Sequence, residues 1–143
     1  MERYIGTKIL KALPMTRGDY NEQRGWPLPE GEDQDVAGYL VEYEDGYQSW
    51  SPATAFEPSY NLLTAMTFGH AIEMLKLGKK VARAGWNGKG QSIFLAVSGT
   101  YVDTDALRQP LRPFIAIQPV EGPVVLWLAS QTDMLVIDWT VVD

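Results

Sequence analysis

The sequence contains no cysteine, a single histidine and no apolar run that approaches the length of a membrane span. The absence of cysteine excludes disulfide bonds, thiolate zinc sites and cysteine nucleophiles. A single histidine excludes multi-histidine metal sites and most histidine-based catalysis. The first residues also lack the uninterrupted apolar stretch of a signal peptide, and nowhere do about 18 apolar residues follow one another. We therefore expect a soluble intracellular protein with no metal site, no cofactor and no conventional catalytic centre.

Charge is unevenly distributed along the 143 residues. Residues 1–64 contain five basic and eleven acidic residues, whereas residues 65–143 contain seven of each, so the net charge of −6 comes from the first part. Neither part has the strongly basic surface that long nucleic acids require. Five cations nevertheless fall within one short stretch of the second part and predict a local positive field suited to a small anion. They are Lys76, Lys79, Lys80, Arg83 and Lys89.

The change in charge coincides with a proline-containing segment, and we place a domain boundary near residues 58–66. Residues 1–60 are predicted to form a small β-rich module that carries a long acidic loop. Residues 66–143 are predicted to form a second module in which one main helix precedes a small antiparallel sheet. That order of elements is typical of an α+β fold.

Turn and strand signals define the first module. A strand is predicted over residues 4–12, followed by a loop without regular structure over residues 14–36. Asp45-Gly46 is a favoured two-residue hairpin turn, and alternating residues flank it. Ser51-Pro52 then predicts the start of a short helix, with the serine as N-cap and the proline as the first helical residue.

The second module begins with a well-delimited helix. Thr67 is a good N-cap, and apolar residues recur after it with helical spacing up to Leu75. Gly78 stands where a left-handed residue ends a helix. Five strands are predicted to follow, over residues 80–83, 92–97, 114–118, 124–126 and 137–142.

The loop GWNGKG, residues 85–90, combines three glycines with Trp86, Asn87 and Lys89. Such a loop lets backbone N–H groups approach a ligand, to which the side chains add a stacking surface, an amide and a cation. The alternative is a glycine-rich hairpin in which Trp86 covers the edge of the core, and the spacing by itself favours this structural role. The segment lacks the phosphate-binding pattern of P-loop nucleotidases.

A second candidate segment is WLASQTD, residues 127–133. Ser130 is predicted to cap a helical turn and Asp133 to complete a capping box, which accounts for both residues without a ligand. The capping box does not account for Trp127 and Gln131. Both could contact a nucleotide, since an indole can stack on a base and an amide can read a base edge. Two segments that each pair a tryptophan with an amide point to an aromatic polar ligand. Since no nucleophile–base pair accompanies them, we predict binding and no catalytic residues.

Three stretches in order, MTFGHAIEMLKLGKKVARAGWNGKG, PFIAI and WLASQTDMLVIDW, resemble the phage Thoeris anti-defence sponge family over residues 66–143. The resemblance implies an α+β fold that assembles into a homotetramer. It also implies a protein that acts in the cytoplasm of an infected bacterium. Its ligands would be immune signalling nucleotides, notably cyclic ADP-ribose isomers and in some relatives cyclic dinucleotides, which the family sequesters without degrading them.

The resemblance also implies site residues. Trp86 and Asn87 belong to the loop that would meet base and ribose, and the second segment contributes four more residues. To these we add Arg83 and Lys89 on electrostatic grounds, since a pyrophosphate requires cations within reach. The four residues of the second segment are Trp127, Ser130, Gln131 and Asp133.

The N-terminal module lies outside this resemblance and leaves other functions open. Its acidic loop resembles a DNA mimic, which would make the chain a protein-binding inhibitor of a defence nuclease, as in an anti-CRISPR protein. A nucleotide hydrolase and a structural phage accessory protein are further alternatives. Release of an intact nucleotide from heat-denatured protein would distinguish a sponge from all three.

Overall fold

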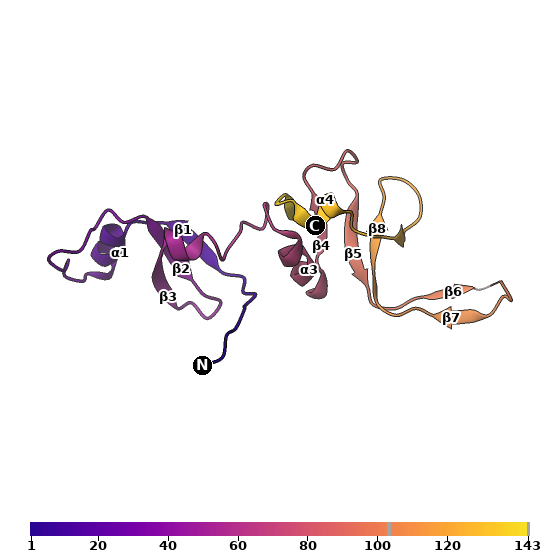
Figure 1. Ribbon diagram of the computed structural model, residues 1–143, viewed down its shortest axis with the longest axis horizontal. Coiled ribbons are helices and arrows are strands. Elements are labelled where there is room, and N and C mark those ends of the chain that lie inside the picture. Colours follow the sequence, from indigo (N-terminus) through magenta and orange to yellow (C-terminus); the bar gives the residue numbers. More distant parts are fainter. Residues whose placement is uncertain (103, 143) are drawn as a thin grey trace. The chain divides into compact units, whose positions relative to one another are not determined.

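The structure, a computed structural model, describes residues 1–102 and 104–142, with the backbone alone for residues 101 and 102. The chain divides into two compact units, Met1–Tyr60 and Asn61–Asp143 (Figure 1). Each unit combines few, short helices with an antiparallel sheet. The predicted α+β fold is therefore confirmed.

The N-terminal unit contains a three-stranded sheet in the order β1-β2-β3, formed by Lys11–Pro14, Gly38–Glu42 and Gln48–Pro52. The prediction of a strand over residues 4–12 was largely wrong, because the strand begins at Lys11. Lys11 pairs with Glu42, the last residue of β2, so earlier residues have no ladder partner in that strand. The start of β1 is therefore set by Glu42, 31 residues further along the chain. A pattern read from neighbouring residues alone cannot predict such a limit.

The hairpin between β2 and β3 is present, but its turn differs from the prediction. Tyr43 donates its N–H to the carbonyl of Tyr47 and accepts one from Gly46, both at 2.9 Å. Gly46 has φ of +85°, the left-handed conformation that glycine adopts at no steric cost. The loop therefore has three residues, Glu44 to Gly46, in place of the predicted two.

The loop predicted to lack structure contains an eight-residue helix, α1 (Arg17–Arg24). The hydroxyl of Thr16 caps it by accepting the N–H of Asp19 at 3.1 Å, and Gly25 ends it with φ of +68°. Its only buried apolar residue is Tyr20, so the apolar periodicity that signals most helices is missing. Its capping residues, Thr16 and Gly25, were the sequence features that could have predicted this helix.

The predicted short helix is present as α2 (Ala53–Phe56), but its start was misplaced. Pro52 is the N-cap, without a side-chain hydrogen bond, and not the first helical residue. Ser51, which was predicted to be the N-cap, instead lies in β3 and pairs with Tyr39 of β2.

The C-terminal unit begins with the predicted helix, α3 (Phe68–Lys76). Thr67 caps it by accepting the N–H of His70 at 3.2 Å. Gly78, with φ of +79°, donates to Leu75, while Lys79 donates to the carbonyl of Met74. This pair of bonds is a Schellman motif, and it confirms the predicted helix end.

A five-stranded antiparallel sheet follows, in the order β10-β4-β5-β8-β9. All five predicted strands are present, and two of them have the predicted bounds. The hairpin of β6 (Thr100–Val102) and β7 (Arg108–Pro110) and the short helix α4 (Gln131–Leu135) complete the unit. The five strands are β4 (Lys80–Arg83), β5 (Ser92–Ala96), β8 (Phe114–Gln118), β9 (Val125–Leu126) and β10 (Trp139–Val142).

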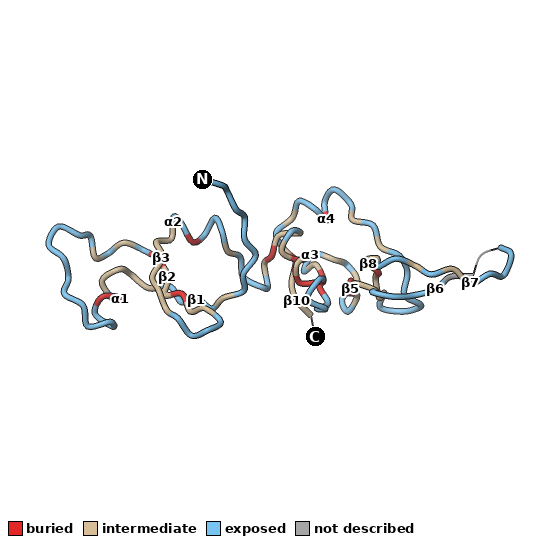
Figure 2. Tube along the Cα trace, turned by 90° about the horizontal axis from the view of Figure 1, so that it is seen from below, coloured by how far each residue is buried: buried red, intermediate tan, exposed pale blue. Residues whose placement is uncertain are grey.

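The main core lies in this C-terminal unit, between α3 and the sheet (Figure 2). It is contiguous, and its largest member, Trp139, is fully buried in β10. The residues that share the core are Met66, Ala71, Met74, Leu75, Val81, Ile93 and Trp139. Several partly buried side chains pack on it, and two of them, Trp86 and Trp127, come from the candidate ligand segments.

Candidate ligand-binding site

The fold brings the two tryptophan-containing segments together. The GWNGKG loop leaves the end of β4, while the WLASQTD segment leaves β9 and leads into α4. The ring centroids of Trp86 and Trp127 lie 6.3 Å apart with an edge-to-face tilt of 65°. A direct bond also joins the segments, since the indole N–H of Trp86 donates to Asp133 Oδ1 at 3.4 Å.

Both indoles belong to an aromatic cluster. Trp139 lies beneath them, with ring centroids 5.4 Å from Trp86 and 5.9 Å from Trp127, each edge-to-face. Phe68 of α3 completes the cluster, 6.2 Å from Trp127 and 5.5 Å from Trp139. Edge-to-face pairs at these distances are favourable beyond the area they bury. Trp86 and Trp127 pack on this cluster and remain partly exposed.

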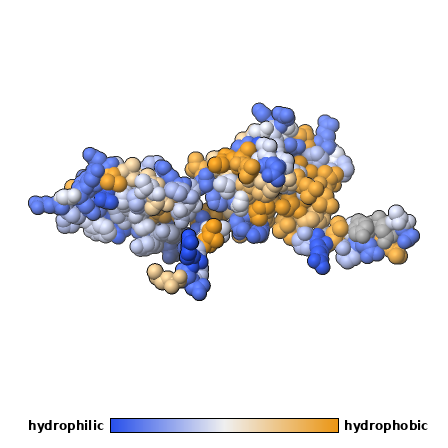
Figure 3. Space-filling model, in the orientation of Figure 1, coloured by the Kyte–Doolittle hydropathy of each residue, from blue (hydrophilic) through white to orange (hydrophobic). Residues whose placement is uncertain are grey.

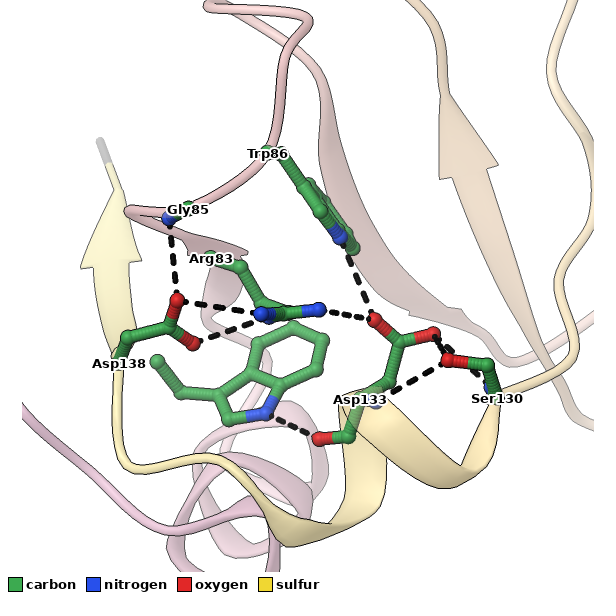
Figure 4. A network of polar contacts seen from close by, with 7 residues as sticks. Arg83, Gly85, Trp86, Ser130, Asp133 and Asp138 are labelled. Carbon is green, nitrogen blue, oxygen red and sulfur yellow. Dashed lines mark hydrogen bonds and ion pairs between the residues drawn. The ribbon is translucent and has the colours of Figure 1, made fainter.

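An ion-pair network holds the loop against α4 and β10 (Figure 4). The Arg83 guanidinium donates to Asp133 at 2.8 Å and forms a two-pronged contact with Asp138 at 2.9 and 3.3 Å. The Arg83 side chain is only 12% exposed. At this burial, charge-assisted bonds are screened less than surface pairs, and removing one partner leaves a charge uncompensated.

The same network perturbs all three ionisable groups. The carboxyl of Asp138 has its pKa lowered, chiefly by the hydrogen bond from Arg83, against the opposing effect of burial. Burial is the largest influence on Asp133 and acts upward, but hydrogen bonds from Arg83, Ser130 and Trp86 together lower its pKa. The pKa of Arg83 is raised, first by Asp138 and then by Asp133. Both carboxylates are thus ionised and structurally engaged at neutral pH.

Two further contacts fix the backbone at this site. Asp138 accepts the N–H of Gly85 at 3.0 Å, and a Cβ at that glycine would lie 2.7 Å from the carboxylate oxygen, so the close approach requires glycine. On the other side, the indole N–H of Trp139 donates to the carbonyl of Asp133 at 2.8 Å. Ser130 and Asp133 form the predicted capping box, which is confirmed.

The remaining candidate side chains are accessible to solvent. Asn87, Lys89 and Gln131 are exposed, as is Ser130. An amide from each segment, one ammonium group and two partly exposed indoles can offer hydrogen bonds, charge and stacking. Within residues 1–102 and 104–142 no group of carboxylates and histidine has the arrangement of a metal site.

Comparison with known proteins decides the family. The family model of the Thoeris anti-defense 2-like domain matches residues 66–142, more than half of the chain. The protein Thoeris anti-defense 2 of Bacillus phage SP01 is 36% identical over 86 residues, which cover 55% of this chain and 97% of that protein. The chain belongs to the Thoeris anti-defense 2-like family. Membership supports a phage anti-defence function.

The Thoeris anti-defense 2-like domain coincides with the unit that contains both candidate segments. The structure brings Trp86, Trp127 and Asp133 into one cluster, and it gives Arg83, Ser130 and Asp133 internal partners. The predicted cluster of five cations is partly neutralised, because Arg83 pairs with two aspartates and Lys76 with Glu73 at 2.8 Å. Asn87, Lys89 and Gln131 have no assigned partner among the described residues.

Sequence reasoning missed the roles of Asp138 and Trp139 in the Thoeris anti-defense 2-like domain. Trp139 is the first residue of β10 and Asp138 directly precedes it, 55 residues from Arg83. The strand pattern marked the segment, but no local signal paired the aspartate with an arginine so distant. Of the helices in the described part of the chain, none has the length and apolar character that crossing a membrane requires.

Proposed function

We propose that this chain binds and sequesters an immune signalling nucleotide, a cyclic ADP-ribose isomer or a related cyclic nucleotide, inside the infected cell without degrading it. The convergence of Trp86 and Trp127, each partly exposed and each with an exposed amide in its own segment, is the observation that carries the proposal. An indole stacks on a base, and amide groups read base edges and ribose hydroxyls.

The charge of the C-terminal unit is compatible with a small anion. Residues 65–143 carry no net charge, in contrast to the acidic first part of the chain. Lys89 lies in the loop beside Trp86 and forms no ion pair with any described residue, so it is the cation we assign to a phosphate. Arg83 is assigned a positioning role, because its guanidinium already pairs with Asp133 and Asp138.

Sequestration requires an affinity higher than that of the immune effector for the same signal. Nanomolar affinity corresponds to about −12 kcal/mol. Stacking contributes about 1–3 kcal/mol per base, so phosphate contacts and a preformed site must supply the rest. The ion-pair network preforms the site, since Arg83 and Asp138 order the loop before any ligand arrives.

We further propose that copies of the chain assemble, as the expected homotetramer, through apolar residues of the C-terminal unit. Side chains at and after β9 and around α4 are exposed although they are large and apolar: Leu126, Leu128, Leu135 and Ile137 are 65%, 88%, 78% and 60% exposed. Large apolar side chains left exposed within a short stretch of one unit supply the surface on which we expect the copies to associate. Light scattering after gel filtration measures the assembly directly.

Calorimetry with a cyclic ADP-ribose isomer tests the binding proposal. We expect nanomolar binding by the full chain and a loss of about 10- to 100-fold in Trp86→Ala, the equivalent of one stacked base. Because Trp86 also packs on Trp139, the exposed variants Asn87→Ala and Gln131→Ala are measured beside it. Each is expected to weaken binding without changing the thermal melt.

Two controls complete this experiment. Lys79→Ala removes an exposed cation of the same unit outside the loop, and it is expected to bind like the parent, whereas Lys89→Ala binds more weakly. Ligand recovered after heat denaturation is expected to be intact. Unchanged affinity in folded Trp86, Asn87 and Gln131 variants, or recovery of a hydrolysed product, would overturn the proposal.

A further inference from the structure

Two shallow hollows lie on the surface of the N-terminal unit, far in sequence from the candidate nucleotide site. One, of about 320 Å³, is lined by aromatic residues that include Trp26, Tyr47 and Trp50. The second, of about 600 Å³, is adjacent to it, since Trp26 lines both. Trp26 is 51% exposed although Tyr20 packs against it edge-to-face at 5.8 Å. We call the two hollows together the Trp26 surface.

The aromatic rings of this surface already hold cations within the unit. The Arg24 guanidinium lies 4.8 Å from the ring centroid of Trp26, and that of Arg17 lies 5.2 Å from the centroid of Trp50. Cations are attracted to the faces of such rings, and indole is the best of them. Trp26 is still 51% exposed with Arg24 and Tyr20 in place, so part of its surface is accessible to a further group.

Carboxylates outnumber cations around the two hollows. Their lining contains four carboxylates and one guanidinium, Arg17, which lies 3.6 Å from Glu32 and is paired with it. Arg24, over the Trp26 ring, is a second cation beside them, so the carboxylates still outnumber the cations. In the part of the chain that the structure describes, the other three carboxylates form no ion pair. They are Asp19, Glu22 and Asp35. An anionic ligand would be repelled here, and a cationic one attracted.

We infer that the Trp26 surface docks a basic segment of a partner protein, inserting an arginine or lysine side chain between the Trp26 indole and the neighbouring carboxylates. Charge complementarity selects this occupant, because the N-terminal part of the chain carries the whole net charge of −6. Tryptophan is enriched among the residues that dominate binding at protein interfaces, and polar groups form the rim around them. The inference is independent of the proposed nucleotide binding, since the two sites lie in different units.

Nuclear magnetic resonance of the full chain tests this inference through its five indole N–H signals. The probe is an octapeptide of alternating arginine and glycine, compared with the same peptide in which glutamine replaces arginine. We expect the arginine peptide to shift the signal of Trp26 saturably, and more weakly at high salt, while the signals of Trp86, Trp127 and Trp139 stay in place. The glutamine peptide is expected to shift none of them.

Matched charge variants make the test specific. Glu22→Gln combined with Asp35→Asn is expected to weaken binding of the arginine peptide about 3- to 10-fold, in keeping with the modest strength of exposed charge pairs. Glu2→Gln combined with Glu44→Gln changes the net charge equally at positions that line neither hollow, and it is expected to leave the affinity unchanged. Trp26→Leu should abolish the interaction, and Trp26→Phe should retain part of it.

Several outcomes would overturn the inference. They are equal binding of the two peptides, equal weakening by both pairs of charge variants, and no shift of Trp26 at millimolar peptide. A shift of Trp26 by a cyclic ADP-ribose isomer would also overturn it, since an anion would then occupy this surface. A shift by that nucleotide confined to Trp86 and Trp127 would instead bear only on the function proposed for the C-terminal unit.

Discussion

The two units of this chain are stabilised in different ways. The C-terminal unit has a contiguous core of seven buried residues centred on Trp139 and Leu75. The N-terminal unit has fewer buried apolar residues. Those that are less than one tenth exposed are Tyr20, Val41 and Phe56. That unit relies on stacked rings, as Phe56 lies between Tyr39 at 4.3 Å and Tyr60 at 4.8 Å.

The surfaces of the two units also differ, in how hydrophobic they are. On the face drawn in Figure 3 the N-terminal unit is mostly hydrophilic, whereas apolar atoms cover much of the C-terminal unit. A unit of about 60 residues buries too little surface for a large core, so aromatic stacks and ring–cation contacts take over part of its stabilisation. The comparison teaches that the more apolar unit carries both the family domain and the candidate nucleotide site.

The largest expected effect follows from removing the centre of the larger core. Trp139→Ala should destabilise the C-terminal unit by about 3–5 kcal/mol, the usual range for a large buried aromatic, because this side chain is fully buried and its N–H holds the Asp133 carbonyl. Thermal melts followed by residue-resolved NMR should show the C-terminal signals lost first. Simultaneous loss of both units would contradict their independence.

The corresponding experiment in the N-terminal unit removes a ring from its aromatic stack. Phe56→Ala removes the middle ring and should cost about 3 kcal/mol, at the lower end of that range since the surrounding core is small. We expect the signals of β1 to β3 to broaden or disappear while Trp86, Trp127 and Trp139 keep their chemical shifts. The conservative variant Phe56→Tyr serves as the control, and its melting profile should match that of the parent.

A smaller effect, concentrated in the C-terminal unit, is expected from acid. Asp133 and Asp138 have folded-state pKa values below those of the unfolded chain. Their contribution is therefore fully present above the unfolded value of about 3.9, and it is lost as pH falls through the folded values. Chemical denaturation at pH 7, 5 and 3 should show the C-terminal unit weakening below about pH 4.

Asp138→Asn sharpens the same test. It should lower stability at pH 7 by about 1.5–3 kcal/mol, the range for a hydrogen bond to a charged group, and make the decline in acid shallower. Glu121→Gln changes one exposed carboxylate of the same unit and should alter neither quantity. An unchanged acid profile in the Asp138 variant would show that the ion-pair network does not contribute to stability.

Local signals explain which parts of the fold could be predicted. The caps of α3 and the box formed by Ser130 and Asp133 depend on residues within one or two helical turns, so the sequence contains them almost completely. The helix α1 was missed although Thr16 and Gly25 mark its ends, since its apolar face consists of Tyr20. Strand β1 was misplaced because its partner fixes its limits.

The sequence by itself determined the chemistry of the candidate site, namely indoles, amides and a cation in two short segments, because residue type is local information. Only the tertiary structure decided which of these side chains contact one another. It paired Arg83 with aspartates 50 and 55 residues away, so the guanidinium predicted to contact a phosphate is engaged within the unit, and it joined Trp86 to Trp127 over a third tryptophan. Such pairings depend on how strands align across a sheet, and chain spacing carries no record of that alignment.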